Sequence, residues 1–338
     1  MPHRVKLDPV SLRTALAAGC LLLCPALSAA PVVALAFSPD GAALVSNGNR
    51  RLVIRSPKDA TLQRHIACDL PKITSLAFAP HGKMLAAGGG DPGVQGEVLL
   101  FTWPDGTFLR RFAGHKDLVT GLDFDPDGTR LGVASSDGQA SIWRCDSEAG
   151  PSDLLRFTDH AAPLFDIAFS PSGEILVTAG ADRSLKVWNS RDGVLQRSLD
   201  QHSKAIHALT FQPHASSDAS PLVCATASDD YTVRLWQPET GRMIRIVRHH
   251  EGPVLALAWA ADGASLFSAG KEGIIRRIDG GSDRIQRQWH AHDDWIYALA
   301  LSPDGTTLAS GDWSGNVRLH DIRPAAPEMP SPAPERRP

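Results

Sequence analysis

Histidine and serine side chains stand near acidic residues at several places where such sets could do chemistry. His292 and Ser310, with the acids around them, have the residue types of Ser-His-Asp acyl transfer. The run Gly88–Gly93 spells G-x-G-x-x-G, the pattern of a dinucleotide-binding turn. A dinucleotide-binding turn must follow a strand and open a helix. Pro92 stands inside this run and indicates a loop between strands instead. We therefore expect no dinucleotide here.

Two clusters have the ligand types of a metal site. His290, His292, Asp293 and Asp294 form one cluster, and 249–251 (His-His-Glu) form the other. The chain has no H-E-x-x-H, G-x-S-x-G, P-loop or C-x-x-C-H motif, and the lack of the last excludes covalent c-type haem. A catalytic, metal or cofactor function therefore depends on which elements carry these clusters.

Composition permits a large core and gives no sign of nucleic-acid binding. The 338 residues are 43% hydrophobic and 21% charged, with a net charge of −3. Lysine and arginine are scattered rather than clustered, so the basic footprint of a nucleic-acid protein is missing.

A strand-like run that ends in a tight turn recurs seven times along the chain. Proline presets one dihedral of such a turn, and glycine accepts the left-handed one. The seven runs are LAFSPDG (35–41), LAFAPHG (76–82), LDFDPDG (122–128), IAFSPSG (167–173), LTFQPHA (209–215), LAWAADG (257–263) and LALSPDG (299–305).

A histidine precedes five of these runs at a nearly regular interval. The five are His115, His160, His202, His250 and His292. Successive spacings of 45, 42, 48 and 42 residues are typical of a four-stranded propeller blade. We predict an all-β, seven-bladed β-propeller of four-stranded antiparallel blades over 29–323.

The chain resembles the WD-repeat family over nearly all of this region. In that family, a His, Ser/Thr, Asp and Trp set forms a buried hydrogen-bonded network in each blade. Repeats four and five carry the whole set: His160, Thr178, Asp182, Trp188 and His202, Thr226, Asp230, Trp236. The resemblance implies that these residues are structural, because satisfied polar networks fix one arrangement.

Other repeats depart from the set. Repeat three keeps His115, Asp137 and Trp143, but Val133 stands where the hydroxyl belongs. Repeat six has His250, Ser268, Glu272 and Ile278, and repeat seven has His292, Ser310, Ser314 and His320. Repeats one and two lack the histidine. His250 and His292 occupy repeat positions, so each of the two candidate metal clusters keeps only one histidine free to bind a metal. That is too few ligands for a dedicated site, and we expect no metal or cofactor.

The last blade has an uncertain outer strand. After 317–320 the chain becomes Pro-rich over 324–338, and such a segment cannot form a regular ladder. Two interpretations remain open: blade seven has three strands or borrows irregular N-terminal residues, or the strand 317–320 offers an open edge to a partner strand.

The face that bears the histidine loops is the expected partner surface, as is common in the family. Trp295 and Trp313 stand outside the repeat's structural tryptophan position, and exposed aromatic anchors near acidic groups are typical of binding hot spots. The candidate residues are Trp295, Trp313, Asp293, Asp294, Asp229, Tyr231 and Phe165.

The first residues have the pattern of an export signal. Arg4, Lys6 and Arg13 precede an apolar stretch, 14–30, that ends in small residues. Ala26 and Ser28 fit the cleavage positions, so 1–28 is predicted as a signal peptide. Lipidation at Cys20 and an uncleaved anchor remain alternatives.

Two further features bear on the compartment. The other cysteines, Cys68, Cys145 and Cys224, fall in different repeats, so no disulfide framework is indicated. The absence of an N-x-[ST] sequon favours a bacterial periplasm.

These features favour a non-enzymatic, exported interaction scaffold, with no membrane span in its mature form. One alternative is an accessory subunit that docks a periplasmic cytochrome or quinoprotein. Another is a metal-dependent propeller hydrolase, which needs several carboxylates and histidines at the axis. The innermost strand of each blade is predicted as a six-residue run: VVALAF (32–37), ITSLAF (73–78), VTGLDF (119–124), LFDIAF (164–169), IHALTF (206–211), VLALAW (254–259) and IYALAL (296–301). In these innermost runs only Asp123, Asp166 and His207 are notable polar residues.

Overall fold

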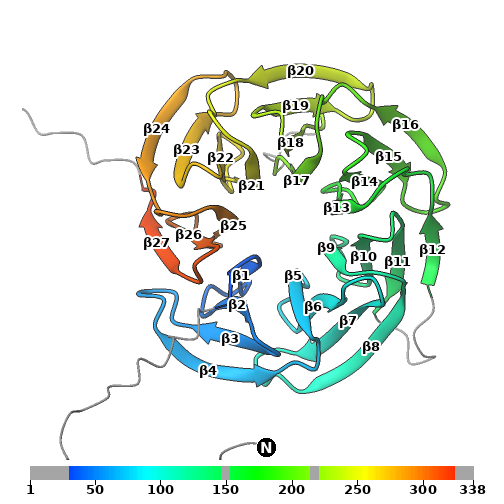
Figure 1. Ribbon diagram of the computed structural model, residues 1–338, viewed down its shortest axis with the longest axis vertical. Coiled ribbons are helices and arrows are strands. Elements are labelled where there is room, and N and C mark those ends of the chain that lie inside the picture. The colour runs from blue at the N-terminus through cyan, green and yellow to red at the C-terminus, as the bar shows by residue number, and fades with distance from the viewer. Residues whose placement is uncertain (1–29, 146–152, 214–220, 324–338) are drawn as a thin grey trace, which may run out of the picture.

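Seven antiparallel sheets form a ring around a central axis (Figure 1). The computed structural model describes residues 30–145, 153–213 and 221–323, so the expected leader (1–28) and Pro-rich tail (324–338) lie outside the described residues. No helix occurs in the ranges described. The prediction of an all-β seven-bladed propeller is confirmed.

Each blade runs from an innermost strand at the axis to an outer strand at the rim. Blades one to three contain β1 (Leu35–Phe37), β2 (Leu44–Gly48), β3 (Arg51–Arg55), β4 (Leu62–Ala67); β5 (Lys72–Phe78), β6 (Met84–Asp91), β7 (Gln95–Thr102), β8 (Phe108–His115); and β9 (Val119–Phe124), β10 (Arg130–Ser135), β11 (Ala140–Arg144), β12 (Asp153–Phe157).

The next three blades repeat this order. They contain β13 (Leu164–Phe169), β14 (Ile175–Gly180), β15 (Leu185–Asn189), β16 (Leu195–Leu199); β17 (Ile206–Phe211), β18 (Cys224–Ser228), β19 (Val233–Gln237), β20 (Arg242–Val247); and β21 (Val254–Trp259), β22 (Ser265–Gly270), β23 (Ile274–Asp279), β24 (Ile285–His290). Among the described residues, blade seven has three strands: β25 (Ile296–Leu301), β26 (Thr307–Asp312) and β27 (Val317–Asp321).

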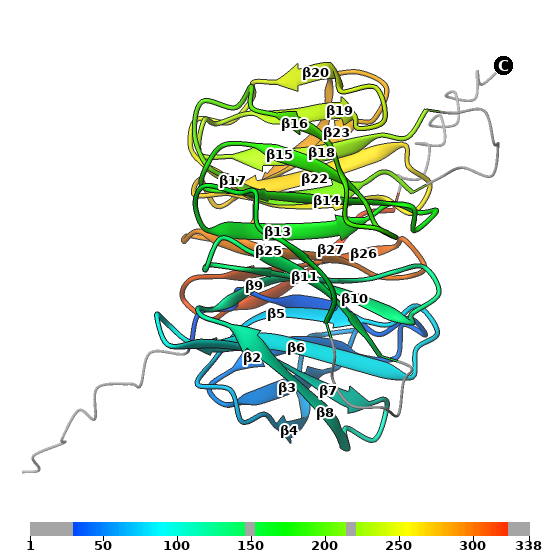
Figure 2. The ribbon, with the colours of Figure 1, turned by 90° about the vertical axis from the view of Figure 1, so that its right-hand side faces the viewer.

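The core lies between neighbouring blades rather than at one centre. Turned on its side, the ring shows the sheets stacked face to face (Figure 2). One cluster joins β14 and β15 to β17, and another joins β22 and β23 to β25. Each blade therefore buries its apolar faces against two neighbours, as expected of a repeat architecture.

The first strand is shorter than the predicted 32–37 because a side chain takes over part of its pairing. Asn47 Oδ1 accepts hydrogen bonds from the amides of Val33 (2.9 Å) and Ala34 (3.0 Å). The Val32 amide instead donates to the carbonyl of Asp312 in the last blade, at 2.9 Å. Blade one and blade seven are thus joined next to the axis.

The glycine run differs from the loop that we predicted. Gly88, Gly89 and Gly90 lie within strand β6, which pairs along its length with β7. A Cβ at Gly89 would lie 1.8 Å from the Lys72 carbonyl oxygen, and one at Gly90 would lie 2.1 Å from that of Gln95. Close backbone approach therefore accounts for these glycines.

Candidate functional site

The histidine sets of blades four and five are closed hydrogen-bonded networks. In blade four, Trp188 Nε1 donates to Thr178 Oγ1 at 2.9 Å, so the threonine hydroxyl donates to His160 Nε2, 2.7 Å away. His160 Nδ1 then carries the proton and donates to Asp182, 2.8 Å away. Blade five repeats this arrangement with His202, Thr226, Asp230 and Trp236, at 2.8 to 2.9 Å.

The carboxylates of these networks are held in the charged form. Burial alone would raise the pKa of Asp137, but hydrogen bonds from His115 and the Lys116 amide outweigh burial and lower this pKa to about 2. The pKa values of Asp182 and Asp230 are lowered in the same way. Each carboxylate therefore works as a fixed acceptor.

Blade three obtains its hydroxyl from an unexpected strand. Val133 stands at the expected position, but Ser141 on β11 lies 2.8 Å from His115 Nε2 and accepts a bond from Trp143 Nε1 at 2.6 Å. His115 Nδ1 lies 3.0 Å from Asp137. Ser141 pairs with Val133 across the sheet, so the hydroxyl reaches nearly the same point from the neighbouring strand.

In blade seven, the assignment of Ser314 to the aspartate position was wrong. His292 Nδ1 lies 2.8 Å from Asp312, two residues earlier, while Ser314 donates to Asp294 outside the network. His320 occupies the tryptophan position and contacts Ser310 Oγ at 2.8 Å. Asp312 thus takes the role that the repeat's usual aspartate position would have, because it is the last residue of β26 and lies next to His292.

A tryptophan from the preceding blade completes this network. Trp289 Nε1 on β24 donates to His320 Nδ1 at 3.1 Å, so His320 donates from Nε2 to Ser310. Ser310 then donates to His292 Nε2, 2.7 Å away. Burial, followed by the charges of His292 and Arg318, lowers the pKa of His320 to about 4, which keeps this ring neutral.

Blade six uses an ion pair where a tryptophan is missing. His250 Nε2 lies 2.8 Å from Ser268, and Nδ1 lies 3.3 Å from Glu272. Arg276 pairs with Glu272, and its Nη1 lies 2.9 Å from His250 Nδ1. A guanidinium can only donate, so in this contact Nδ1 accepts and Nε2 holds the proton. This tautomer is opposite to that of blade four.

These networks explain the residues that suggested catalysis or metal binding. His250 and His292 are buried and committed to neighbouring side chains, and Ser310 lies between two histidines. His290 is exposed, with Nδ1 4.0 Å from Asp293. Over the residues described, no group of three or more His, Cys, Asp or Glu side chains is placed to hold a metal ion.

The inner carboxylates link neighbouring blades. Asp123 accepts the amide of Phe169 at 2.7 Å, and Asp166 accepts that of Leu209 at 2.8 Å. Burial raises the pKa of each to about 7. Both bonds run from one innermost strand to the next, so these groups stabilise the ring.

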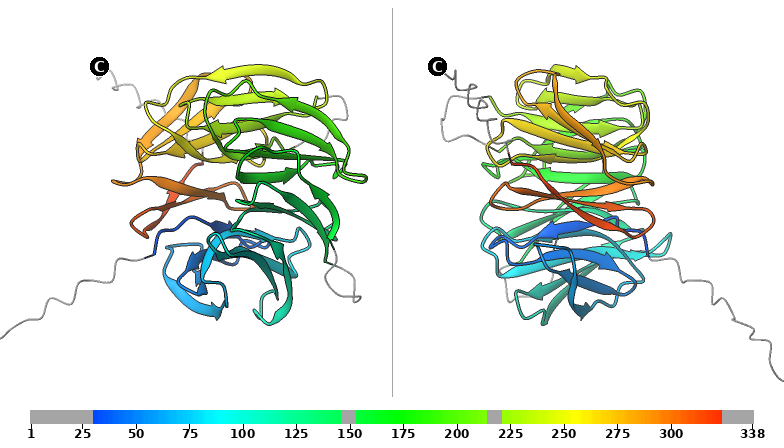
Figure 3. Two further views of the ribbon diagram at one scale, coloured as in Figure 1. Left: turned by 45° about the vertical axis from the view of Figure 1, so that its right-hand side comes forward. Right: turned by 90° about the vertical axis from the view of Figure 1, so that its left-hand side faces the viewer.

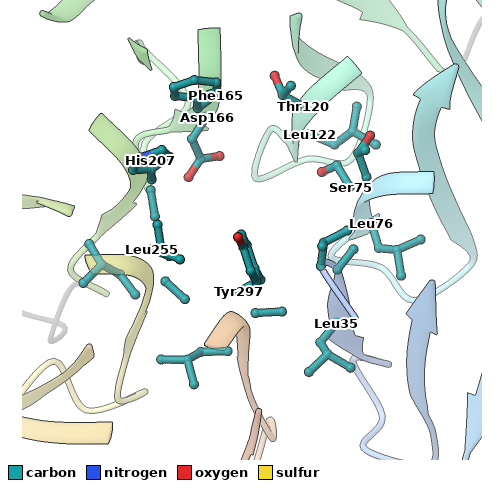
Figure 4. A pocket seen from close by; sticks show the side chains of 18 residues that line it. Leu35, Ser75, Leu76, Thr120, Leu122, Phe165, Asp166, His207, Leu255 and Tyr297 are labelled. Atoms are coloured by element: carbon teal, nitrogen blue, oxygen red, sulfur yellow. The ribbon is translucent and has the colours of Figure 1, made fainter. Parts of the chain in front are cut away.

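One residue from each blade forms a ring at the mouth of the central channel, around a cavity of about 220 Å³ (Figure 4). Each is the second residue of an innermost run, and the seven are Val33, Thr74, Thr120, Phe165, His207, Leu255 and Tyr297. Blades four, five and seven therefore supply aromatic or imidazole rings.

The rings of blades four and five stack on each other. Phe165 and His207 lie with centroids 5.0 Å apart and planes inclined by 16°. His207 Nε2 lies 2.9 Å from Asp229 Oδ1, without the alignment of a hydrogen bond. Tyr231 stands nearby in sequence, 40% exposed, with Lys204 Nζ 5.1 Å from its ring centre.

Three rings of blade seven lie together on the same side of the molecule. Tyr297 contacts both tryptophans, with centroids 6.3 Å from Trp295 and 5.4 Å from Trp313. Trp295 is 41% exposed and Trp313 is 52% exposed. Lys271 from blade six lies 3.9 Å over the Trp295 ring. The two tryptophans are thus surface residues with fixed positions.

The predicted acidic residues have different surroundings. The Asp293 side chain is 91% exposed. Asp294 accepts bonds from the Ser314 hydroxyl at 2.7 Å and the Trp295 amide at 2.8 Å. Tyr297 lines the same cavity as Phe165 and His207, so the two groups of rings meet there. Burial, together with the charges of Asp294 and Asp229, raises the pKa of Tyr297. We call this surface the mouth face: Phe165, Lys204, His207, Asp229, Tyr231, Lys271, Asp293, Asp294, Trp295, Tyr297 and Trp313.

Sequence reasoning missed four members of the mouth face: Lys204, His207, Lys271 and Tyr297. Phe165, His207 and Tyr297 share one repeat position, and Asp229, Lys271 and Trp313 share another. Comparing the seven repeats column by column could have found them, because equivalent positions in a propeller lie on one ring.

Fold and mouth face together define a β-propeller with an exposed aromatic surface around its channel. A family model described as "WD domain, G-beta repeat" matches residues 58–94, 106–144, 152–189, 193–237, 241–279 and 283–321. These matches cover more than half of the chain, so the chain belongs to the WD-repeat family. The family model matches six repeats, while the structure has seven blades.

Individual relatives are distant. The chain is 25% identical over 295 residues to Periodic tryptophan protein 2 of Saccharomyces cerevisiae, covering 75% of this chain and 31% of that protein. It is 27% identical over 233 residues to the guanine nucleotide-binding protein subunit beta of Solanum tuberosum, covering 63% and 58%. The chain thus spans less than two thirds of the length of these relatives. No helix in the described residues is both long and apolar enough to cross a membrane.

Proposed function

We infer that this protein is a non-enzymatic scaffold that holds protein partners on its mouth face. The observation that carries this function is the exposure of Trp295 and Trp313 around Tyr297. Buried networks account for the tryptophans at the repeat's structural position, whereas these two lie outside those networks.

The chemistry of the mouth face supports protein binding. Large aromatic side chains that already have fixed positions lose little conformational entropy when a partner covers them. Charged groups of both signs surround them, with Lys271 over Trp295 and Asp293 fully open to solvent. An aromatic centre with a polar rim is typical of hot spots in protein interfaces.

Substitution of both tryptophans tests this function. Trp295→Ala with Trp313→Ala should reduce partner capture by at least about tenfold, since each hot-spot aromatic contributes about 2 kcal/mol or more. Thermal unfolding should change little. Phe108→Ala is the matched control, because Phe108 is 53% exposed on the rim strand β8 and should leave capture unchanged. Equal capture by both variants would contradict the proposal, and a large loss of stability would show that the tryptophans are core residues.

The proposed setting is the periplasm. Arg4, Lys6 and Arg13 before an apolar stretch support export, and the small residues Ala26 and Ser28 support cleavage after Ser28. Intact-mass and N-terminal analysis of the protein from its own host should show a chain that begins at Ala29. A native chain that keeps residues 1–28 in the cytoplasm would contradict export.

A further inference from the structure

Blade seven lacks the outer strand that the other six blades possess, within the residues described. Strand β27 therefore forms the rim of its blade (Figures 1 and 3). Beside it lies a hollow of about 490 Å³, which extends from His290 and Ala291 past β27 to the turn 58–60 of blade one. The hollow thus occupies the place of a missing strand.

The six outer strands share an apolar residue at a fixed position. It stands seven residues before the first buried residue of the next innermost strand, as in Leu199 before Ile206. The six are Ile66, Phe112, Phe157, Leu199, Val247 and Trp289. Five of them are buried and Trp289 is half-buried. The equivalent residue in blade seven would lie opposite Val317, as Leu199 lies opposite Leu185.

An arginine stands two positions before this apolar residue in five of the six strands. The five are Arg64, Arg110, Arg197, Arg245 and Arg287, and blade three has Leu155 instead. Arg197 Nε donates to the Glu239 carbonyl at 2.9 Å, and Arg245 donates to Gly281 at 2.5 Å.

Two more of these arginines reach backbone carbonyls of the next blade. Arg64 donates to the carbonyl of Asp105 in the turn after β7, and Arg287 donates to the carbonyl of Asp321, the last residue of β27. For Arg110, the corresponding segment of blade three, 146–152, lies outside the described residues. The arginine therefore joins an outer strand to the turn after the third strand of the next blade, or in blade seven to the end of that strand.

The corresponding turn in blade one faces the hollow. Its Ala60 amide donates to the Ser56 carbonyl at 3.0 Å, as the Gly241 amide donates to Gln237 at 2.8 Å in blade five. Ala60 keeps the left-handed backbone of that glycine, with φ of 59°. A Cβ at Gly241 would lie 3.4 Å from Leu199 Cδ2 and 3.1 Å from Arg197 Cδ. The Ala60 methyl therefore leaves room for a leucine, while the stem of the arginine must shift slightly away from it. At Gly106 a Cβ would lie only 2.5 Å from Ile66 Cδ1, so isoleucine fits less well beside Ala60.

The sequence before blade one lacks both the apolar residue and the arginine at the spacing found in the other outer strands. Seven residues before Val32 stands Pro25, and two positions earlier stands Leu23. Proline cannot donate a ladder hydrogen bond, and leucine cannot bind the turn carbonyls. At the spacing that holds in the other six blades, the residues before Val32 are therefore not suited to form the outer strand of blade seven.

We propose that β27 binds an extended segment of another protein that carries an arginine two residues before a leucine. The segment pairs antiparallel with β27, its leucine covers Val317, and its guanidinium binds the carbonyls of the turn 56–60. Asp59 and Lys58 both line the hollow, so their charges offset each other and the turn carbonyls recognise the guanidinium. Strand addition at a sheet edge gives affinity through the backbone and specificity through alternate side chains.

A labelled peptide copied from β16 and its neighbours, residues 193–201, is a direct probe because it carries Arg197 and Leu199. Titrated into the full-length native protein, it should bind saturably, and amide hydrogen exchange of Val317–Asp321 should slow on binding. Peptides with Arg197→Ala or Leu199→Asp should bind at least about tenfold more weakly, since each loses a charge-assisted bond or an apolar contact.

Three results would overturn the proposal: absence of saturable binding, equal binding of the altered peptides, or slow exchange of Val317–Asp321 before peptide is added. The last result would mean that the chain's own residues or a second copy cover the edge. The Trp295→Ala, Trp313→Ala variant should bind the peptide normally, so failure at this edge and failure of the mouth face can be distinguished.

Discussion

At the scale of single residues, the sequence identified the His, Ser/Thr, Asp and Trp sets as structural networks. It did not identify the residues that replace missing members of these sets, Ser141 in blade three and Asp312 in blade seven. The spacing of His160, Asp182 and Trp188 predicted their network because all three hold the expected repeat positions. Ser141 was missed because a hydroxyl can reach the same histidine from an adjacent strand. Asp312 was missed because it is the last residue of β26, whereas the repeat's aspartate position, Ser314, falls in the turn that follows.

Asp123 gives a prediction about pH at this scale. Its folded pKa is raised to about 7, so the folded state binds the proton more tightly than the unfolded chain, and stability falls as pH rises from about 4 through 7. Asp123→Asn keeps an oxygen for the Phe169 amide and cannot ionise. We expect the variant to equal the wild type near pH 3 and to gain a stability advantage that is larger at pH 8 than at pH 5, as measured by urea unfolding.

Four histidines also titrate in this range, but they do not obscure the comparison. His202, His250, His292 and His320 have lowered pKa values, so they weaken the fold as pH falls from about 6.5, and they do so equally in both proteins. A stability difference between variant and wild type that does not change from pH 5 to 8 would contradict the assignment of Asp123.

At the scale of the blade, the periodic runs predicted strands and turns well, because proline and glycine mark the same turn in repeat after repeat. Strand ends were harder to predict. In blade one, the Asn47 side chain accepts hydrogen bonds that a strand would otherwise make. In blade two, the Lys72 backbone lies so close to β6 that only glycine fits at Gly89. Both effects depend on contacts with segments distant in sequence.

Blades five and six differ in how many groups depend on one hydroxyl. Thr226 serves both His202 and Trp236, whereas Ser268 serves His250 alone, since Ile278 replaces the tryptophan. Thr226→Val should therefore cost about 3 kcal/mol of unfolding free energy and Ser268→Ala about 1–2 kcal/mol, from the number of buried groups left unpaired. Denaturant unfolding measures both, and equal losses would argue against the network as the source of stability.

At the scale of the whole molecule, seven blades make a ring for which we propose two different places for partners. The mouth face gathers aromatic residues from blades four, five and seven, while the edge of β27, which no described strand covers, lies on the rim. The sequence predicted seven blades and left the closure of the last one open. The repeat pattern could not predict this closure, because the residues at the repeat's spacing are not suited to form an outer strand for blade seven.

Lysine cross-linking of the native complex, read by mass spectrometry, tests the mouth face most directly. Lys204 and Lys271 lie over Tyr231 and Trp295 on this face. Lys83 stands in the turn between β5 and β6, at the opposite ends of the strands, and serves as an internal control. We expect partner cross-links to concentrate on Lys204 and Lys271. Cross-links that favour Lys83, or that fall equally on all three lysines, would contradict a mouth face that holds partners.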